Sequence, residues 1–282
     1  MKKFEQPLFH LNGSVNDDHF EFFQKYGVIQ FRNFISKETV SQFLKEIKKV
    51  ETQLLSAGTT RINGVPLKFG KNTDGSVIIQ RMAFVSQYSN TLSEFLKSER
   101  IQMLVKLLEP YKGRVSEDEN DGLVLNHYLN TSESVFAKLG WHTDAPRDIF
   151  LGRKISPMLN VGLHLDDCPM SNGGLRVLPA THKQGWLRLF FKKKYFIDNK
   201  SDPDETGFDI EAGDLTIHDG RIWHRVQQSP YIGEKSRRRV LYIPLITGAY
   251  DPKNHHSPTA LYHKLGQLSI KFNQKINRAK NK

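Results

Sequence analysis

Short apolar runs interrupted by turn-forming residues fill the second half of the chain, and they constrain its fold more than any other feature. Between Gly122 and about Ile246 the runs are separated by Gly, Pro, Asn or Asp, and they cover residues 123–129, 158–165, 175–178, 214–218, 223–226 and 240–246. Runs of this length and composition are typical of β-strands. Because many short strands follow one another, we expect a sandwich or a barrel.

Helical signals precede these runs. Asn16 can cap a short helix that Gly27 ends, and residues 28–31 then have the composition of a strand. Ser36 can open a second helix, in which apolar residues recur at helical spacing. Further along, the pattern predicts a hairpin turn at 63–64, a β-rich stretch over 77–88 and a third amphipathic helix through 95–108.

The 282 residues are predicted to form one domain, because no linker, internal repeat or low-complexity segment divides them. The expected fold class is mainly β with flanking α, in which helices pack outside a β core of about residues 121–247. The stretch 259–282 has apolar residues at near-helical spacing with lysines between them. We expect it to form a terminal helix that ends in a basic tail.

The chain is basic, with 41 Lys and Arg against 30 Asp and Glu and a formal charge of +11. Such a charge suits a nucleic acid, a membrane surface or a small anionic substrate, and a solvated basic tail explains part of it equally well. A single cysteine, Cys168, cannot form an internal disulfide, so nothing indicates an oxidising compartment. No run of about eighteen apolar residues occurs, so we expect a cytoplasmic protein without membrane insertion.

A histidine and an aspartate stand two residues apart at His142 and Asp144. In an extended strand residues i and i+2 project from the same face, so the two side chains can share one ion. Two nitrogen ligands and one carboxylate, with coordination positions left open, suit iron(II) in oxygenases. A second histidine is then required, and His218 and His224 follow about eighty residues later.

Local turn signals favour His224 as the third ligand. Asp219-Gly220 predicts a turn, after which His224 begins a strand, whereas His218 ends the preceding strand and is expected to be a neighbour of the site or a hydrogen-bonded structural histidine. An arginine run, residues 237–239, leads into the apolar strand that follows. One inward-facing arginine can pair bidentately with the remote carboxylate of a five-carbon dicarboxylate, and the other two are expected to be solvated.

Several separated segments resemble the phytanoyl-CoA dioxygenase family of iron(II)- and 2-oxoglutarate-dependent oxygenases. They are the helix and strand over 23–29, the segment 32–36, the W-H-x-D of 141–144, the N-G-G-L-R-V-L-P-A-T-H of 172–182 and the Gly-Asp at 213–214. The resemblance implies a double-stranded β-helix, or jelly-roll, of about eight core strands with flanking helices. It also implies the cofactor Fe(II), the cosubstrate 2-oxoglutarate and O₂.

The resemblance also implies roles for particular residues. His142, Asp144 and His224 match the metal ligands, and Arg238 best matches the 2-oxoglutarate-binding arginine, with Arg237 and Arg239 as alternatives because the spacing from His224 is longer than usual. Asn126 and Tyr128, on the preceding strand, match positions that can contact the cosubstrate, although ordinary strand residues would fit there equally well. Thr143 is expected to support the ligands from behind.

The resemblance further implies that a substrate C–H bond is hydroxylated while 2-oxoglutarate is converted to succinate and CO₂. Asp144 favours hydroxylation over halogenation, since halogenating relatives have a small residue in that place. A cluster of cations directly after the H-x-D, formed by Arg147, Arg153 and Lys154, favours with the overall charge a small anionic substrate. No nucleic-acid partner is expected for such an enzyme. Two alternatives remain, a jelly-roll holding zinc or manganese without redox chemistry and a basic module that binds nucleic acid or membrane.

Overall fold

Two antiparallel sheets form the body of the protein in a computed structural model that describes residues 4–145 and 155–260. The larger sheet has the order β1-β12-β9-β14-β7-β5-β4, and β6 pairs with β14. Its strands are β1 (Val28–Phe31), β4 (Lys68–Lys71), β5 (Val77–Met82), β6 (Arg114–Val115), β7 (Val124–Tyr128), β9 (Met158–His164), β12 (Leu215–Asp219) and β14 (Arg238–Ile246).

The smaller sheet has the order β11-β10-β13-β8. Its strands are β8 (Leu139–His142), β10 (Gly174–Val177), β11 (Thr206–Gly207) and β13 (His224–Gln227). The six predicted runs between Gly122 and Ile246 each correspond to a strand of one of these sheets. The predicted β-rich jelly-roll architecture is therefore confirmed, and the larger sheet also includes β1, β4, β5 and β6 from outside the expected core.

Two predicted helices form with the expected caps. Before α1 (Asp17–Tyr26) the Asn16 side chain accepts a hydrogen bond from the His19 amide, and Gly27 ends the helix in the left-handed region with φ 74°. Before α2 (Lys37–Ser56) the Ser36 hydroxyl accepts from the Thr39 amide. The predicted hairpin is also present, and it joins β2 (Arg61–Ile62) to β3 (Val65–Pro66).

The prediction of one continuous third helix is wrong, because the helix is interrupted. Residues 90–108 form α3 (Asn90–Lys97), α4 (Glu99–Gln102) and the 3₁₀ segment η2 (Met103–Leu108). The break lies at Ser98, whose backbone is extended at ψ 148° and whose hydroxyl donates to the Phe95 carbonyl. Serine competes for backbone hydrogen bonds in this way, and apolar periodicity does not reveal it.

The expected β-rich stretch over 77–88 is correct only as far as β5. Phe84 adopts a left-handed φ of 54°, which ends the extended chain, and η1 (Val85–Tyr88) follows. A further helix, α6 (Trp186–Phe191), was not predicted. The remaining 3₁₀ segments are η3 (Met170–Asn172), η4 (Thr181–Lys183) and η5 (Gly233–Ser236).

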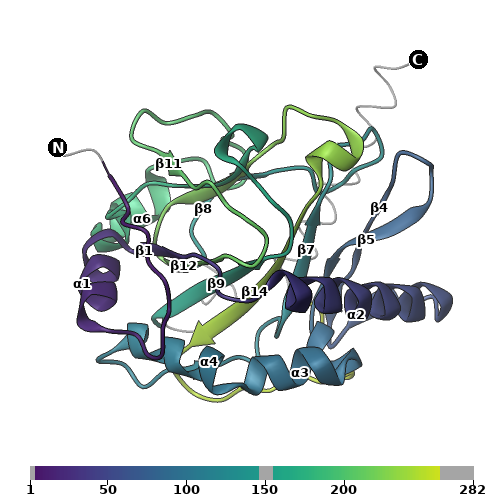
Figure 1. Ribbon diagram of the computed structural model, residues 1–282, viewed down its shortest axis with the longest axis horizontal. Helices are drawn as coiled ribbons and strands as arrows, with labels where there is room; N and C mark the ends of the chain where they lie inside the picture. The colour runs from purple at the N-terminus through teal and green to yellow at the C-terminus, as the bar shows by residue number, and fades with distance from the viewer. Residues whose placement is uncertain (1–3, 146–154, 261–282) are drawn as a thin grey trace.

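The larger sheet has two chemically different faces because side chains alternate along each strand. One face packs against α2, α3 and α4, which lie along one side of the sheet in Figure 1. Leu159, Val161 and Leu163 of β9 and Leu241, Ile243 and Leu245 of β14 supply that core. The opposite face carries polar side chains: Asn126, Tyr128, Asn160, His164, Thr216, His218, Arg238 and Tyr242.

The expected terminal helix and basic tail lie outside the described residues from 261 onward. Within the described part, no helix is both long and apolar enough to cross a membrane.

Candidate metal centre

Strand pairing in the smaller sheet brings the two predicted histidine ligands together. His142 is the last residue of β8, His224 is the first of β13, and the two are paired in register. Asp144 follows in the turn after β8, where its amide donates to the Gly220 carbonyl at 2.7 Å. The turn before β13 therefore positions the aspartate, whereas the sequence argument had placed it on the strand itself.

The potential ligand atoms of His142, Asp144 and His224 all lie within 4.8 Å of one another. The Nε2 atoms of His142 and His224 are 4.0 Å and 3.9 Å from the carboxylate oxygens of Asp144. Donors that each lie about 2.1 Å from one divalent ion are about 3 to 4 Å apart. Both separations therefore fit a single shared ion.

The remaining ring nitrogens set the imidazoles for metal binding. Nδ1 of His142 donates to the Gly140 carbonyl at 2.8 Å, and Nδ1 of His224 donates to the Ile222 carbonyl at 3.1 Å. With Nδ1 carrying the proton, Nε2 presents its lone pair to the ion. The donor set of two neutral imidazoles and one carboxylate thus fits iron(II).

Burial and mutual charge give these groups the protonation states that ligands require. Burial alone would raise the pKa of the Asp144 carboxyl, yet three neighbouring imidazoles, that of His224 foremost, hold that pKa well below its ordinary value. Burial lowers the pKa of His142, and burial with two nearby histidines lowers the pKa of His224 further. At neutral pH the site therefore offers a carboxylate and uncharged imidazoles.

Asn160 is a residue of this site that the sequence reasoning missed. Its side-chain amide donates to Oδ2 of Asp144 at 2.9 Å. Such a contact holds the ligand carboxylate in one orientation. The available signal was the pair of polar residues Asn160 and His164 inside the apolar run 158–165, which alternation places on one face of β9.

His218 lies beside the three ligands and not among them, as predicted. Its Nε2 is 3.8 Å from Oδ2 of Asp144, and its ring centre is 4.4 Å from that of His224. The side chain is buried, and within the described structure neither ring nitrogen has a hydrogen-bond partner.

The three arginines after β13 have different surroundings. Arg239 forms an ion pair with Asp166 at 2.5 Å, and Arg237 pairs with Glu234. Arg238 is 3% exposed and lies on the polar face of β14, paired in register with Tyr128. It is therefore the arginine of this run that the structure directs between the two sheets.

The Arg238 guanidinium donates to three backbone carbonyls, those of Gln227 at 2.8 Å, Ala137 at 3.2 Å and Ser236 at 3.4 Å. Since a guanidinium has five N–H groups, no more than two remain for a ligand. Two is the number that a bidentate carboxylate requires.

Asn126 and Tyr128 lie on the same inner face, where the Asn126 amide donates to the Tyr128 hydroxyl at 3.3 Å. Burial raises the pKa of Tyr128 to about 12, so its phenol stays protonated and can donate. The Asn126 Oδ1 atom is buried and, among the described residues, has no partner. Both side chains can therefore offer hydrogen bonds to a polar ligand.

A small hollow separates these residues, bordered by Tyr128, His164, Arg238 and Tyr242 among others. Its volume of about 20 Å³ corresponds to about one water molecule. A five-carbon dicarboxylate beside Arg238 therefore requires these side chains to move apart.

The segment after α6 borders the metal ligands, which no local sequence signal indicated. The Phe196 ring stacks on that of His142 with ring centres 4.8 Å apart, and Phe196 has a left-handed φ of 59°. The Tyr195 hydroxyl is 2.5 Å from Oγ1 of Thr143. Thr143 thus contacts the segment that covers His142, and its role behind the ligands stays a prediction.

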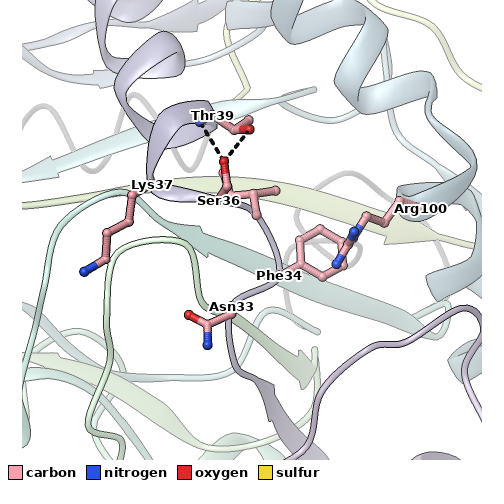
Figure 2. Close-up of a pocket in the computed structure, with 7 residues that line it drawn as sticks. Asn33, Phe34, Ser36, Lys37, Thr39 and Arg100 are labelled. Atoms are coloured by element: carbon pink, nitrogen blue, oxygen red, sulfur yellow. Dashed lines mark hydrogen bonds between the residues drawn. The ribbon is translucent and has the colours of Figure 1, made fainter.

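A larger hollow of about 560 Å³ lies elsewhere, at the start of α2 (Figure 2). The Arg100 guanidinium stacks on Phe34 there, 4.7 Å from the ring centre. The residues that line it are Asn33, Phe34, Ile35, Ser36, Lys37, Thr39 and Arg100. None of these seven is a carboxylate, histidine or cysteine, so this hollow cannot hold a catalytic metal.

The basic residues expected to contact the substrate, Arg147, Arg153 and Lys154, lie outside the described residues.

Solved structures of similar fold include several 2-oxoglutarate-dependent enzymes. The epimerase SnoN, in complex with Fe³⁺, α-ketoglutarate and nogalamycin RO, is 16% identical with a TM-score of 0.58, over 83% of this chain and 84% of that one. The carbocyclase SnoK is 13% identical with a TM-score of 0.59, over 88% of both chains. HygX from Streptomyces hygroscopicus, with nickel and 2-oxoglutarate bound, is 14% identical with a TM-score of 0.58, over 85% and 90%.

At these identities the similarity establishes the fold alone. No curated protein matches the chain. A family model decides the relationship, because the model of phytanoyl-CoA dioxygenase (PhyH) matches residues 23–232 and so includes all three ligands. The chain therefore belongs to the phytanoyl-CoA dioxygenase family of iron(II)- and 2-oxoglutarate-dependent oxygenases.

Proposed function

We propose that this protein hydroxylates a C–H bond of a small organic substrate, using iron(II), 2-oxoglutarate and O₂. The observation that carries the proposal is the convergence of His142, Asp144 and His224 with their ligand atoms within 4.8 Å. Three protein ligands leave the rest of the coordination sphere for a cosubstrate and oxygen. The reaction balances when one oxygen atom of O₂ enters the substrate as hydroxyl and the other enters succinate as CO₂ is released.

An iron(II) ion held by His142, Asp144 and His224 would supply the site at which O₂ is activated, and the residues around it would bind and orient the reactants. Arg238 holds the carboxylate of 2-oxoglutarate that is remote from the metal, through the two N–H groups that its backbone contacts leave available. Tyr128 donates a hydrogen bond from its protonated phenol, and Asn126 offers both an amide and a free carbonyl oxygen. Asn160 keeps the Asp144 carboxylate turned toward the ion.

Asp144 supports hydroxylation over halogenation. With a metal bound, its carboxylate would fill the ligand position that a halide would need beside the two histidines. The Asn160 hydrogen bond and the contact of the Asp144 amide with Gly220 hold it there from two sides.

A second outcome at the same site is supported by the names of two structural neighbours, the epimerase SnoN and the carbocyclase SnoK. Epimerisation inverts a carbon by removing its hydrogen and returning one on the opposite face, and carbocycle formation joins two carbons of the substrate, so neither outcome adds a hydroxyl. Turnover in ¹⁸O₂ separates the two outcomes, since hydroxylation adds one labelled oxygen to the product and the alternatives add none.

We further propose that the substrate carries an anionic group, on the strength of the net charge and of the cations at 147, 153 and 154. Replacing Arg147 and Arg153 together is expected to raise the KM for the true substrate strongly and to leave kcat nearly unchanged, because both would contribute to binding. An unchanged KM would contradict this substrate class.

The decisive experiment is anaerobic addition of iron(II) and 2-oxoglutarate, followed by a search for a visible charge-transfer band and for succinate release with candidate substrates. The variant His224→Ala should lose the band, whereas His255→Ala, which replaces an exposed histidine outside the triad, should keep it. Tight zinc or manganese binding with no band and no O₂ uptake would support a non-redox site instead. Nucleic-acid binding that depends on salt and survives loss of His142 and His224 would support a basic binding module.

A further inference from the structure

A cluster of exposed apolar side chains lies within a short basic segment next to the metal centre. Leu187 is 77% exposed, Phe191 79%, Phe196 57% and Ile197 77%. Exposed apolar residues scattered singly need no explanation, but these four lie within eleven residues of chain and among basic residues, which indicates an interaction site. We call residues 186–200, which include α6 and the chain after it, the apolar-basic segment.

This segment is anchored, so its exposed side chains are not the result of a loose loop. The Tyr195 hydroxyl donates to the Leu189 carbonyl at 2.8 Å, and the Trp223 indole donates to the Arg188 carbonyl at 3.0 Å. Backbone hydrogen bonds join Trp141 to the segment at Phe196 and at Asp198, at 2.9 Å and 2.8 Å.

The contacts with Trp141 tie the segment to β8, the strand that ends at the ligand His142. The buried side of the apolar-basic segment, which includes Leu189, faces the protein, while Leu187, Phe191 and Ile197 face solvent. The strained left-handed backbone of Phe196 is held in place by these contacts. Apolar side chains are thus kept in water by a well-packed framework.

The charge of the segment indicates what covers it. Residues 186–200 contain five basic residues and one acidic residue, and Arg188, Lys192 and Lys194 are exposed among the apolar side chains. Lys193 contributes less, because it pairs with Asp202 at 2.6 Å. The occupant must therefore combine an apolar interior with an anionic surface.

An anionic lipid surface meets both requirements better than a protein partner does. Protein interfaces are depleted in lysine, whereas lysines interleaved with Phe, Leu and Ile are typical of segments that lie in the headgroup region of a bilayer. The chain's formal charge of +11 adds a long-range attraction toward anionic lipid.

We propose that the apolar-basic segment docks the protein peripherally on an anionic membrane surface. Leu187, Phe191 and Ile197 enter the boundary between headgroups and acyl chains, and Lys192 and Lys194 contact lipid phosphates. Because the Phe196 ring stacks on His142, docking places the edge of the metal centre at the membrane. The proposal does not depend on the chemistry at the metal, since vesicle binding is measured without iron or 2-oxoglutarate.

The test is co-sedimentation of the full chain with phosphatidylcholine vesicles and with vesicles containing roughly one third phosphatidylglycerol, at low salt. The intact protein should bind the anionic vesicles and not the neutral ones. The double variant Lys192→Ala, Lys194→Ala should bind about thirtyfold more weakly. The double variant Leu187→Ser, Ile197→Ser should bind at least about tenfold more weakly.

Matched controls replace equally exposed residues on other parts of the surface. Ile232→Ser removes a side chain that is 75% exposed. Ile232 lies away from the apolar-basic segment, because its neighbour Gly233 lies against Thr73 in the turn between β4 and β5. Lys37→Ala with Lys45→Ala removes two exposed lysines of α2. Both controls should bind as the intact protein does, and urea unfolding should show equal stability for all variants because every replaced side chain is exposed.

Four results would overturn the proposal. The first is an absence of vesicle binding by the intact protein, and the second is equal binding to neutral and anionic vesicles. The third is that the control variant Lys37→Ala, Lys45→Ala binds anionic vesicles as weakly as Lys192→Ala, Lys194→Ala does. A fourth is self-association in the absence of vesicles that the Leu187→Ser, Ile197→Ser variant abolishes, since the segment would then be an interface between copies of the chain.

Discussion

Replacing Arg238 tests how the site binds its cosubstrate, and the expected effect can be estimated from the structure. The guanidinium is 3% exposed and already donates to three backbone carbonyls, so a bound carboxylate receives the remaining two N–H groups. Arg238→Gln removes both charge-assisted hydrogen bonds and leaves the dicarboxylate end buried without its cation. Loss of one partner of a buried ion pair costs about 3 to 5 kcal/mol.

That free energy corresponds to a dissociation constant for 2-oxoglutarate raised between about one hundred and several thousandfold. The assay is an anaerobic titration of 2-oxoglutarate into iron(II)-loaded protein, followed by the visible charge-transfer band. Arg238→Lys keeps the charge but loses the planar fork, so its dissociation constant should lie between those of the glutamine variant and the intact protein. Iron(II) affinity without cosubstrate should change little in either variant.

Two neighbouring arginines provide matched controls on the same short stretch of chain. Arg239 is engaged by Asp166 and Arg237 by Glu234, so Arg239→Gln and Arg237→Gln should bind 2-oxoglutarate normally. The reasoning fails if Arg239→Gln weakens 2-oxoglutarate binding as much as Arg238→Gln does. It also fails if Arg238→Gln folds, as urea unfolding would show, and binds the cosubstrate with unchanged affinity.

Three further predictions follow from single contacts. Asn160→Ala should lower iron(II) affinity about 10- to 100-fold in an anaerobic titration, because Asp144 loses the amide that orients it, and unchanged affinity would exclude that role. Burial lowers the pKa of His164 to about 3, so between about pH 6.5 and 3 the unfolded chain binds a proton that the folded chain does not, and the free energy of unfolding falls as the pH falls. His164→Gln should make this fall, measured by urea unfolding, less steep. Parallel curves for the variant and the intact protein would contradict the prediction. Burial, and next the nearby Arg81, lower the pKa of Lys68 to about 7, so the folded chain releases this proton at a lower pH than the unfolded chain does. The free energy of unfolding should therefore rise between about pH 7 and 10.5, by at most about 1.4 kcal/mol per pH unit. Lys68→Met should remove this rise, and an equal rise in the variant would refute the prediction.

Much of the architecture was predictable because its signals are local. Each run of apolar residues between turn formers became a strand, and the caps Asn16 and Ser36 opened the helices expected of them. The helix expected over 95–108 failed at Ser98 because a hydroxyl hydrogen bond to the preceding turn competes with helix continuation.

The second contact layer of the metal centre was less predictable. Asn160 lies sixteen residues from Asp144 and reaches it from the opposite sheet, and Phe196 reaches His142 from an unpredicted stretch after α6. Such contacts depend on how separate strands and loops are packed. No spacing rule within one segment encodes them.

The sequence by itself determined most of the strands, the two capped helices and the pairing of His142 with Asp144, because strand alternation, helix capping and a two-residue spacing are properties of neighbouring residues. Tertiary structure decided the rest of the site. Residues 240–246 are apolar on both faces of their strand, so alternation alone could not say which arginine of the run before them turns inward. Packing of alternate residues of β14 against α2, α3 and α4 directs Arg238 to the opposite face. In the same way only the pairing of β8 with β13 brings His224 onto His142, since that contact joins strands about eighty residues apart in the chain.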